Sequence, residues 1–398
     1  MKRNILFVMP SLSAGGGEKS LVNLLSQIDY NQYNVDLFLL NHEGIFMEYI
    51  PKEVNVLPLP QNYMNFILPL HKSVSGFMKN GKLSLVYNRL MFTMKNKLYS
   101  NTSIKEQYSW RNIRSSLETL EKKYDVAIGF LEKSSTYFCA EKVNATKKVG
   151  WVHIDYDKLG MDPKFDGKYF GKLDHIITVS EECSKILKER FPSESEKIRV
   201  IYNIVSPNMI NKMADQGNET PYSKKENEVT ILSIGRLHYQ KGFDLAVKAC
   251  KILVDRGHSL KWHIIGEGDE REKLTKLIKE NNLENNLILL GLKSNPYPYI
   301  KHADIYAQTS KFEGKSIAID EAKILQKPIV VTNYSTAKDQ ILNGNNGLIV
   351  EMEDVAIADG IERLIKDHKL REKLKGNLSK ECLSTEEEIN KLYNLFRV

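Results

Sequence analysis

The chain has 398 residues, of which 42% are hydrophobic and 27% charged, and its formal net charge is +7 at pH 7. This length exceeds one ordinary hydrophobic core, so we expect a soluble protein of two domains. The four cysteines are scattered without metal-ligand spacing, which argues against a zinc module or a disulfide framework and favours reduced thiols in the cytoplasm. No run approaches the ~20 apolar residues of a membrane-spanning helix, and the apolar start at residues 5–9 is too short for a secretory signal.

Short apolar runs alternate with amphipathic segments through the first half of the chain. This alternation is typical of parallel strands connected by helices, because a strand that is buried on both faces is continuously apolar. The predicted strands are residues 4–9, 35–40, 54–57, 126–130, 148–152 and 175–180. The sequence therefore predicts an α/β fold, with a Rossmann-like, doubly wound parallel sheet in the N-terminal half.

Three consecutive glycines, Gly15, Gly16 and Gly17, follow the first predicted strand. Because they lack a Cβ atom, they allow positive φ angles and close approach of the backbone to a ligand at the carboxyl end of that strand. The spacing is not GxGxxG, so a tight structural turn is the alternative interpretation.

Residues 62–114 have a different character, since nine cations face a single acid, Glu106. Apolar and aromatic residues lie between the charges, which predicts helices with an apolar face and a basic rim that contact an anionic membrane. The alternative is a set of helices packed on the domain core with a solvated basic face. The cations are Lys72, Lys79, Lys82, Arg89, Lys95, Lys97, Lys105, Arg111 and Arg114.

His153 follows the predicted strand at 148–152. Open α/β sheets bind their ligands at the carboxyl ends of the strands, so this position favours a role in the site. A structural histidine is the alternative, and Asp155, two residues further on, is a weaker candidate.

A polar stretch at residues 213–228 is the best linker, after which the alternation of strands and helices begins again. We expect an N-terminal domain over residues 1–207, a linker over 208–228 and a C-terminal domain over 229–380. Apolar residues at helical spacing predict a last helix within 381–398 that docks on an apolar surface. The strands of the second half are predicted at residues 229–234, 262–265, 287–290, 305–309 and 329–332.

Arg236 and Lys241 follow the first strand of the second half, next to Gly235 and Gly242. An arginine fork and a mobile lysine charge could clamp a diphosphate, and the glycines would allow the backbone to approach it. A surface charge pair is the alternative.

Glu313 and Glu321 flank the start of an apolar stretch that predicts a helix from about residue 315 to residue 325. The first turn of a helix presents backbone N–H groups that suit an anionic oxygen. A separation of eight residues spans roughly 12 Å of helix, which one nucleotide sugar could bridge. Solvated helix charges are the alternative.

These motifs occur together and in order, and the chain thereby resembles the retaining glycosyltransferases of family 4, which have the GT-B fold. The resemblance implies two Rossmann-like domains that face each other across a cleft, with the acceptor on the first and the nucleotide sugar on the second. It also implies that the C-terminal helix within 381–398 crosses back to the first domain.

The resemblance further implies a role for each candidate residue. Arg236 and Lys241 would hold the diphosphate without a metal or another cofactor, Glu321 would bind the ribose, and Glu313 would bind the sugar. Around them, the implied contacts are the glycine loop 15–17 closing over the donor, His153 lining the cleft, the backbone at Gly314, Lys315, Ser316 and Ile317, and Lys293 in the stretch 291–295 near the base.

Lys315 and Ser316 depart from the aromatic or apolar residue and proline that commonly follow the Glu-Gly pair. That variation resembles enzymes of capsule and cell-surface polysaccharide synthesis. We therefore expect a cytoplasmic enzyme, peripheral at the inner face of the membrane through residues 62–114. It would transfer a sugar from a UDP-linked or similar donor to a lipid-linked or cell-envelope glycan.

Three rival functions remain open from the sequence. A soluble glycosyltransferase acting on a protein, a glucan or a small sugar would not need residues 62–114 at a membrane. A non-catalytic subunit of the same fold should have lost the cations or carboxylates that this chain retains. A nucleotide-sugar epimerase is the third rival, and the resemblance of this chain to family 4 in particular argues against it. Nucleic acid is not an expected partner, because none of its usual binding motifs is present.

Overall fold

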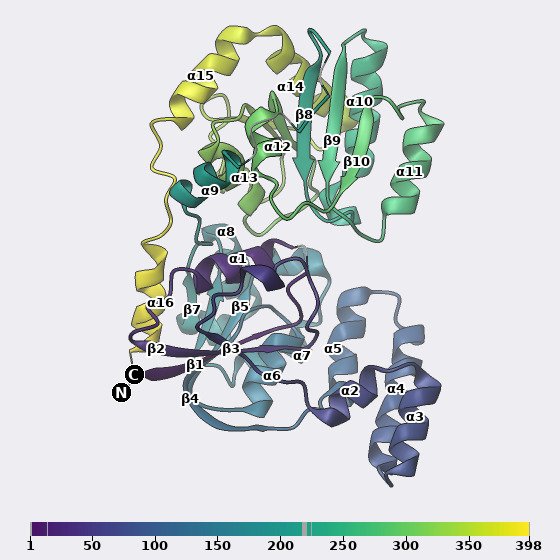
Figure 1. Cartoon of the computed structure of the whole chain (residues 1–398), viewed down its shortest axis with the longest axis vertical. Helices are drawn as coiled ribbons and strands as arrows, with labels where there is room; N and C mark the ends of the chain where they lie inside the picture. Colours follow the sequence, from purple (N-terminus) through teal and green to yellow (C-terminus); the bar gives the residue numbers. More distant parts are fainter. Residues whose placement is uncertain (1, 14, 217–220, 224, 398) are drawn as a thin grey trace. The chain divides into compact units, whose positions relative to one another are not determined.

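The computed structural model describes residues 2–13, 15–216, 221–223 and 225–397. The chain forms two compact units. The first comprises Met1–Ser13, Leu24–Tyr202 and Glu388–Val398, and the second comprises Ala14–Asn23 and Asn203–Glu387. Each unit contains one parallel sheet with helices packed against it (Figure 1).

The first unit is built on a seven-stranded sheet of order β3-β2-β1-β4-β5-β6-β7, in which neighbouring strands are parallel. This order reverses direction beside β1, as in a doubly wound fold. The strands are β1 (Arg3–Met9), β2 (Tyr33–Leu39), β3 (Val54–Val56), β4 (Leu120–Gly129), β5 (Val143–Val152), β6 (His175–Thr178) and β7 (Ile198–Val200).

Two strands of this sheet begin earlier than the sequence predicts. β4 starts at Leu120 and β5 at Val143, and their first residues pair with each other before the apolar runs begin. Most side chains of this extension, such as those of Lys123 and Asn144, are exposed or partly exposed, whereas Tyr124 and Val143 are buried. These two buried residues are isolated and form no apolar run, so the sequence pattern did not predict the extension, which backbone pairing holds in the sheet.

The helices of the first unit include four between β3 and β4. Helix α1 (Gly16–Leu25) begins in the second unit and ends in the first. The others are α2 (Gln61–Ile67), α3 (Leu70–Lys79), α4 (Leu83–Leu98), α5 (Thr102–Ile113), α6 (Ser134–Lys142), α7 (Pro163–Phe170), α8 (Glu181–Arg190) and α16 (Glu388–Phe396).

The second unit has a six-stranded parallel sheet of order β10-β9-β8-β11-β12-β13. Its strands are β8 (Val229–Ile234), β9 (Leu260–Ile265), β10 (Leu287–Gly291), β11 (Ile305–Gln308), β12 (Ile329–Thr332) and β13 (Leu348–Val350). Its helices are α9 (Pro207–Ala214), α10 (Phe243–Asp255), α11 (Arg271–Glu280), α12 (Tyr297–His302), α13 (Ile317–Ile324), α14 (Asp354–Lys366) and α15 (His368–Leu378).

Burial on both faces of the second sheet explains its continuous apolar strands. Ile231 and Leu232 are adjacent on β8 and fully buried, but they belong to separate hydrophobic clusters. Because successive strand residues point to opposite faces, each cluster lies on one side of the sheet. The predicted α/β class and the two Rossmann-like parallel sheets are thereby confirmed.

Helices α2, α3 and α4 form a small group that stands apart from the strands of the first sheet (Figure 1). Phe66, Phe77 and Leu85 make a core of their own and are buried. Arg89 is buried as well, because its guanidinium donates to the Leu68 carbonyl and the Thr93 hydroxyl. These four side chains are therefore not part of an exposed apolar face or basic rim, contrary to the expectation for residues 62–114.

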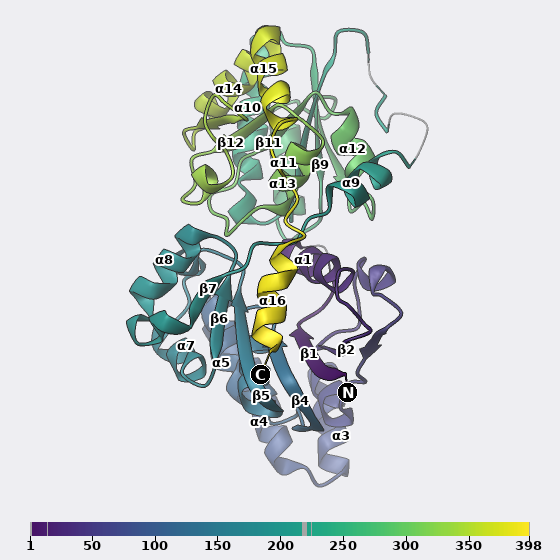
Figure 2. The same cartoon turned by 90° about the vertical axis from the view of Figure 1, so that its left-hand side faces the viewer.

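Helix α16 packs within the first unit (Figure 2). Tyr393 stacks on Tyr33 with ring centroids 5.2 Å apart and donates from its hydroxyl to the Gln27 carbonyl at 3.3 Å. Part of the predicted linker is helical, since α9 lies inside the second unit with Ser206 as its N-cap. Residues 217–220 and 224 of that linker lie outside the described residues. Among the described helices, none has both the length and the apolar character needed to cross a bilayer.

Candidate active site

The loop after β8 carries the predicted phosphate cations and is fastened to the end of β11. Gly242 has a φ of +60°, and a Cβ atom there would lie 2.1 Å from the Thr309 carbonyl oxygen. The Thr309 hydroxyl donates to the Lys241 carbonyl at 3.0 Å, and the Lys311 amide donates to the Gln240 carbonyl at 2.7 Å. Only glycine fits at residue 242, and the close approach fixes the position of Lys241.

The absence of a side chain at Gly235 leaves space for the Lys241 side chain. A Cβ atom at Gly235 would lie 3.0 Å from both Cδ and Cε of Lys241. The lysine stem therefore lies against the glycine backbone, and its amine reaches Glu313 with 2.5 Å between Nζ and Oε1. The structure thus brings together four of the predicted site residues and their flanking glycines, namely Gly235, Lys241, Gly242 and Glu313.

Glu313 is buried, with only 6% of its surface exposed. The Ser310 hydroxyl at 2.7 Å, the Gln308 amide at 3.1 Å and Lys241 all donate to its Oε1 atom. Burying a carboxylate is costly unless donors replace the lost water, and three donors on one oxygen meet that need. Glu313 is therefore not a solvated helix charge.

Arg236 differs from Lys241 in being accessible. Its side chain is 54% exposed, and its guanidinium lies 3.6 Å from the Glu18 carboxylate of α1. This pair is within the second unit, to which residues 14–23 belong. The pair is long and its guanidinium is half exposed, although Glu18 is only 10% exposed, so Arg236 is free to bind another anion from solvent.

Glu321 lies on α13 and is 1% exposed. The Tyr297 hydroxyl donates to it at 3.1 Å, and the Lys19 amine of α1 forms an ion pair with it. Lys19 also lies over the Tyr297 ring, 4.5 Å from its centroid. The adjacent residues Glu18 and Lys19 thus contact Arg236 and Glu321, the predicted diphosphate and ribose ligands.

The glycine stretch is helical rather than a loop. Gly16 and Gly17 form the first residues of α1, and none of Gly15, Gly16 and Gly17 has a positive φ. A Cβ atom at Gly16 would contact nothing, whereas one at Gly15 would collide with the Glu18 side chain. The expected positive φ angles are therefore wrong, whereas the expected close approach of this backbone to a ligand stays a prediction; Gly15 leaves room for Glu18.

The start of α13 also departs from the prediction. The Ser316 amide is already engaged, because it donates to Gln340 Oε1 at 2.8 Å. Lys315 forms an ion pair with Asp320 at 3.5 Å. Ile317 is the first residue of α13, and Gly314 directly precedes Lys315. A ligand oxygen would have to displace Gln340 to reach the Ser316 amide.

Lys293 and His153 have partners of their own. Lys293, in the second unit, lies over the Tyr299 ring at 5.7 Å. His153 is in the first unit, stacked on Trp151 with centroids 5.7 Å apart. Burial lowers the pKa of His153 to about 3, so its imidazole is neutral at pH 7, and its buried Nε2 atom has no hydrogen-bond partner among the described residues.

Several residues of the site went unpredicted. Gln308 and Ser310 bind Glu313, and Gln340 binds both Ser316 and Asp320. A polar residue at the end of a buried strand was a usable signal for Gln308, but nothing in the sequence relates Gln340 to α13. Within the described part of the chain, histidine, cysteine and carboxylate side chains form no group of three that could hold a metal ion.

Comparisons with known proteins relate the second unit to a sequence family. Residues 216–381 match the family model described as Glycosyl transferases group 1. Over 92% of its length the chain is 24% identical to 91% of an N-acetylgalactosaminyltransferase of Campylobacter jejuni, whose full name specifies an N-acetylgalactosamine-N,N'-diacetylbacillosaminyl-diphospho-undecaprenol acceptor. It is also 24% identical, over 100% of this chain and 98% of the relative, to the capsular polysaccharide biosynthesis glycosyltransferase CapM of Staphylococcus aureus. The chain is 30% identical to the uncharacterized glycosyltransferase MJ1059 of Methanocaldococcus jannaschii, but the match covers only 50% of this chain and 51% of that protein.

Among solved structures, a mutant of S. aureus TarM in complex with Fondaparinux, alpha-GlcNAc-glycerol and UDP is similar over 100% of both chains. Its TM-score is 0.69 at 17% sequence identity, which shows a shared fold. The family match and this neighbour support the predicted glycosyltransferase resemblance with the GT-B fold.

Proposed function

We propose that the protein is a retaining glycosyltransferase of family 4. In this proposal it transfers a sugar from a nucleotide-sugar donor to a hydroxyl group of a lipid-linked or cell-envelope glycan. The observation that carries the proposal is the buried Glu313 carboxylate, held by Lys241, Gln308 and Ser310 at the carboxyl edge of the second sheet. A buried, preorganised charge, paired with a lysine whose loop also carries an accessible arginine, is typical of a site built for reaction rather than for stability.

Arg236 and Lys241 bind the donor diphosphate and stabilise the negative charge that develops on it as the glycosidic bond breaks. Without donor, Glu18 occupies the position at Arg236 that the donor diphosphate takes when it binds. Lys19 likewise occupies the position at Glu321 that the ribose hydroxyls take. Donor binding replaces two charge pairs with ligand contacts. No metal ion is required in this scheme, because the two cations neutralise the leaving group.

Retention follows from displacement on one face of the sugar. The bond between the anomeric carbon and the phosphate oxygen breaks, and the acceptor oxygen bonds to that carbon from the same side. The acceptor proton passes to the departing phosphate. Glu313 stabilises the sugar near the reacting carbon, while Lys293, with the stretch 291–295, lies on the base side of the donor.

Two observations support the proposed lipid-linked or cell-envelope acceptor, namely the names of two relatives and the surface of residues 62–114. The Campylobacter relative acts on a lipid diphosphate by its name, and CapM acts in capsule biosynthesis. Residues 62–114 supply a surface for an anionic membrane. Nine of the thirteen large hydrophobic side chains that are exposed in the described residues lie between Met64 and Leu98, which concentrates them on α2, α3 and α4.

The exposed stripe of α4 provides a test of membrane contact. Leu83, Tyr87, Leu90, Met94 and Leu98 recur every three or four residues, so they share one helix face. We expect Leu90→Glu/Met94→Glu to lower co-sedimentation with phosphatidylglycerol vesicles at low salt by about tenfold or more, since two apolar contacts become repelled anions. Val355→Glu, an exposed change on α14 of the second unit, is the control and should bind as the parent does. A parent protein that does not sediment would favour the soluble alternative.

Arg236→Ala tests the donor site directly. Because Arg236 is exposed and weakly paired, we expect its loss to change stability by no more than about 0.5 kcal/mol. Transfer or slow hydrolysis of the preferred nucleotide sugar should fall by roughly 10²-fold or more. The assay uses UDP-, GDP- and ADP-sugars with a chelator present.

Arg256→Ala is the matched control for this experiment. Arg256 caps α10 at the amino edge of the sheet, away from the strand ends that carry the site, and pairs with Asp359 and Glu362. Its loss should leave turnover unchanged. If no donor binds the parent protein, the non-catalytic alternative replaces the proposed enzyme.

A further inference from the structure

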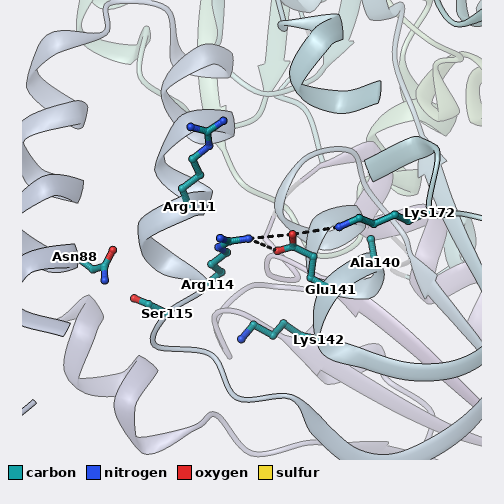
Figure 3. A pocket seen from close by; sticks show the side chains of 8 residues that line it. All are labelled: Asn88, Arg111, Arg114, Ser115, Ala140, Glu141, Lys142 and Lys172. Carbon is teal, nitrogen blue, oxygen red and sulfur yellow. Dashed lines mark hydrogen bonds and ion pairs between the residues drawn. The ribbon is translucent and has the colours of Figure 1, made fainter. Parts of the chain in front are cut away.

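The first unit contains a second cationic site outside the residues proposed for the reaction. A cavity of about 710 Å³ is bordered by α4, α5, α6 and the residue Lys172 that follows α7 (Figure 3). Its lining consists of Asn88, Arg111, Arg114, Ser115, Ala140, Glu141, Lys142 and Lys172. Four of these residues are cations and one is an anion, so the cavity carries a local excess of positive charge.

Glu141 organises one half of the cavity. Both of its carboxylate oxygens accept from the Arg114 guanidinium, at 3.0 and 3.1 Å, and Lys172 approaches from the other side at 3.5 Å (Figure 3). The buried Trp110 indole also donates to it at 3.3 Å. Both oxygens of this carboxylate are engaged, so it makes no hydrogen bond with the remaining cations, although its charge still acts on Lys142.

Arg111 and Lys142 are those remaining cations. Neither has a hydrogen bond or ion pair with any described residue, although both line the same cavity. Arg111 is nevertheless held in place, since its guanidinium lies 5.9 Å from the Tyr108 ring centroid and 5.6 Å from that of Phe165. Partial burial, and then repulsion by Arg114, lower the pKa of the Lys142 amine. An anion beside Arg114 and Lys142 would relieve this repulsion, which Glu141 and Glu118 offset only in part.

The cavity lies at the opposite edge of the sheet from the expected reaction site. Ser115, Lys142 and Lys172 each precede a strand, namely β4, β5 and β6, so they belong to the amino edge. Ligands that react in open α/β sheets bind at the carboxyl edge. A ligand bound in this cavity would therefore be anchored apart from the reacting atoms.

We propose that this cavity binds a phosphoryl group, as in a phosphomonoester or a diphosphate. Arginine forks match phosphate oxygens, and Lys142 and Lys172 add point charges that tolerate different oxygen positions. The net excess of three positive charges suits a dianion or trianion better than a single carboxylate.

Calorimetric titration with inorganic pyrophosphate tests the proposal. The full chain carrying Arg236→Ala is used, so that binding at the proposed donor site does not obscure binding in the cavity. We expect saturable binding that is weakened at least about tenfold by Arg111→Gln/Lys142→Gln, since each cation supplies a charge-assisted hydrogen bond. Lys72→Gln/Lys79→Gln removes two exposed charges of α3 and should leave the affinity within about twofold.

Equal affinity in the Arg111/Lys142 variant and its parent would overturn the proposal, and so would the absence of pyrophosphate binding. Arg111→Lys keeps the charge but not the fork, and should bind more tightly than the Arg111/Lys142 variant, which separates the electrostatic role from a packing role. If the double variant fails to fold, Lys142→Gln alone decides by the same criterion.

Dihexanoyl phosphatidic acid, used below its micelle concentration, distinguishes the two sources of the phosphoryl group. Tighter binding than pyrophosphate, again lost in the Arg111/Lys142 variant, would identify a lipid headgroup. Binding no tighter than pyrophosphate would identify a soluble phosphate ligand. The outcome is independent of the donor assay, because Arg111 and Lys142 take no part in the proposed reaction.

Discussion

Lys241→Met is expected to destabilise the second unit by about 3 kcal/mol and to lower donor turnover by roughly 10²-fold or more. The physical reason is asymmetry within the Lys241–Glu313 pair. The Glu313 side chain is 8% exposed and that of Lys241 is 19% exposed, so removal of the lysine leaves a largely buried carboxylate without a compensating charge. Gln308 and Ser310 remain as donors to Glu313 but carry no compensating charge.

Adding Glu313→Gln to this variant should recover most of the stability and none of the turnover. The double variant buries a neutral amide of similar volume, so the uncompensated charge disappears, while both charges proposed for the reaction are lost. Hydrogen exchange of amides in β8 and β11 measures the stability of this unit, and donor hydrolysis measures turnover.

Two results would contradict the predicted coupling. Stability in the double variant no better than in Lys241→Met would mean that the two side chains are not energetically linked. Parental turnover in Lys241→Met would remove this lysine from the proposed reaction.

Gly242→Ala is expected to cost about 3 kcal/mol or more and to raise the KM for the donor by more than tenfold. Its Cβ atom would lie 2.1 Å from the Thr309 carbonyl oxygen, and its φ of +60° disfavours any side chain. The loop could relieve this collision only by moving away from β11, which would take Lys241 away from Glu313.

Gly257→Ala is the matched control for the strain alone. Gly257 follows α10 with a φ of +84°, but a Cβ atom there would have no neighbour within 4 Å. We expect a cost of about 1–2 kcal/mol from the positive φ alone and an unchanged KM. If both alanine variants behaved alike in denaturation and kinetics, the close approach at Thr309 would have no role in positioning Lys241.

Local rules predicted the elements well because their signals are local. Apolar runs bounded by glycine, proline and polar residues predict buried parallel strands, and the strand from Val229 to Ile234 was predicted to the residue. The missed starts of β4 and β5 have mostly exposed side chains, with Tyr124 and Val143 as isolated buried residues, so backbone pairing rather than an apolar run defines them. The same limit applies to Arg89, whose charge predicts exposure, although a carbonyl and a hydroxyl acceptor allow its burial.

The sequence by itself determined the class of fold, the two sheets and the identity of the charged residues that follow β8 and β11. It could do so because hydrophobic periodicity and glycine positions depend on near neighbours in the chain. Only the tertiary structure decided that Lys241 pairs with Glu313, that Gln340 already binds the Ser316 amide, and that Arg111 and Lys142 share one cavity without acceptors among the described residues. These relations join residues from 24 to 72 positions apart, and no local preference encodes which distant side chain will satisfy a buried charge.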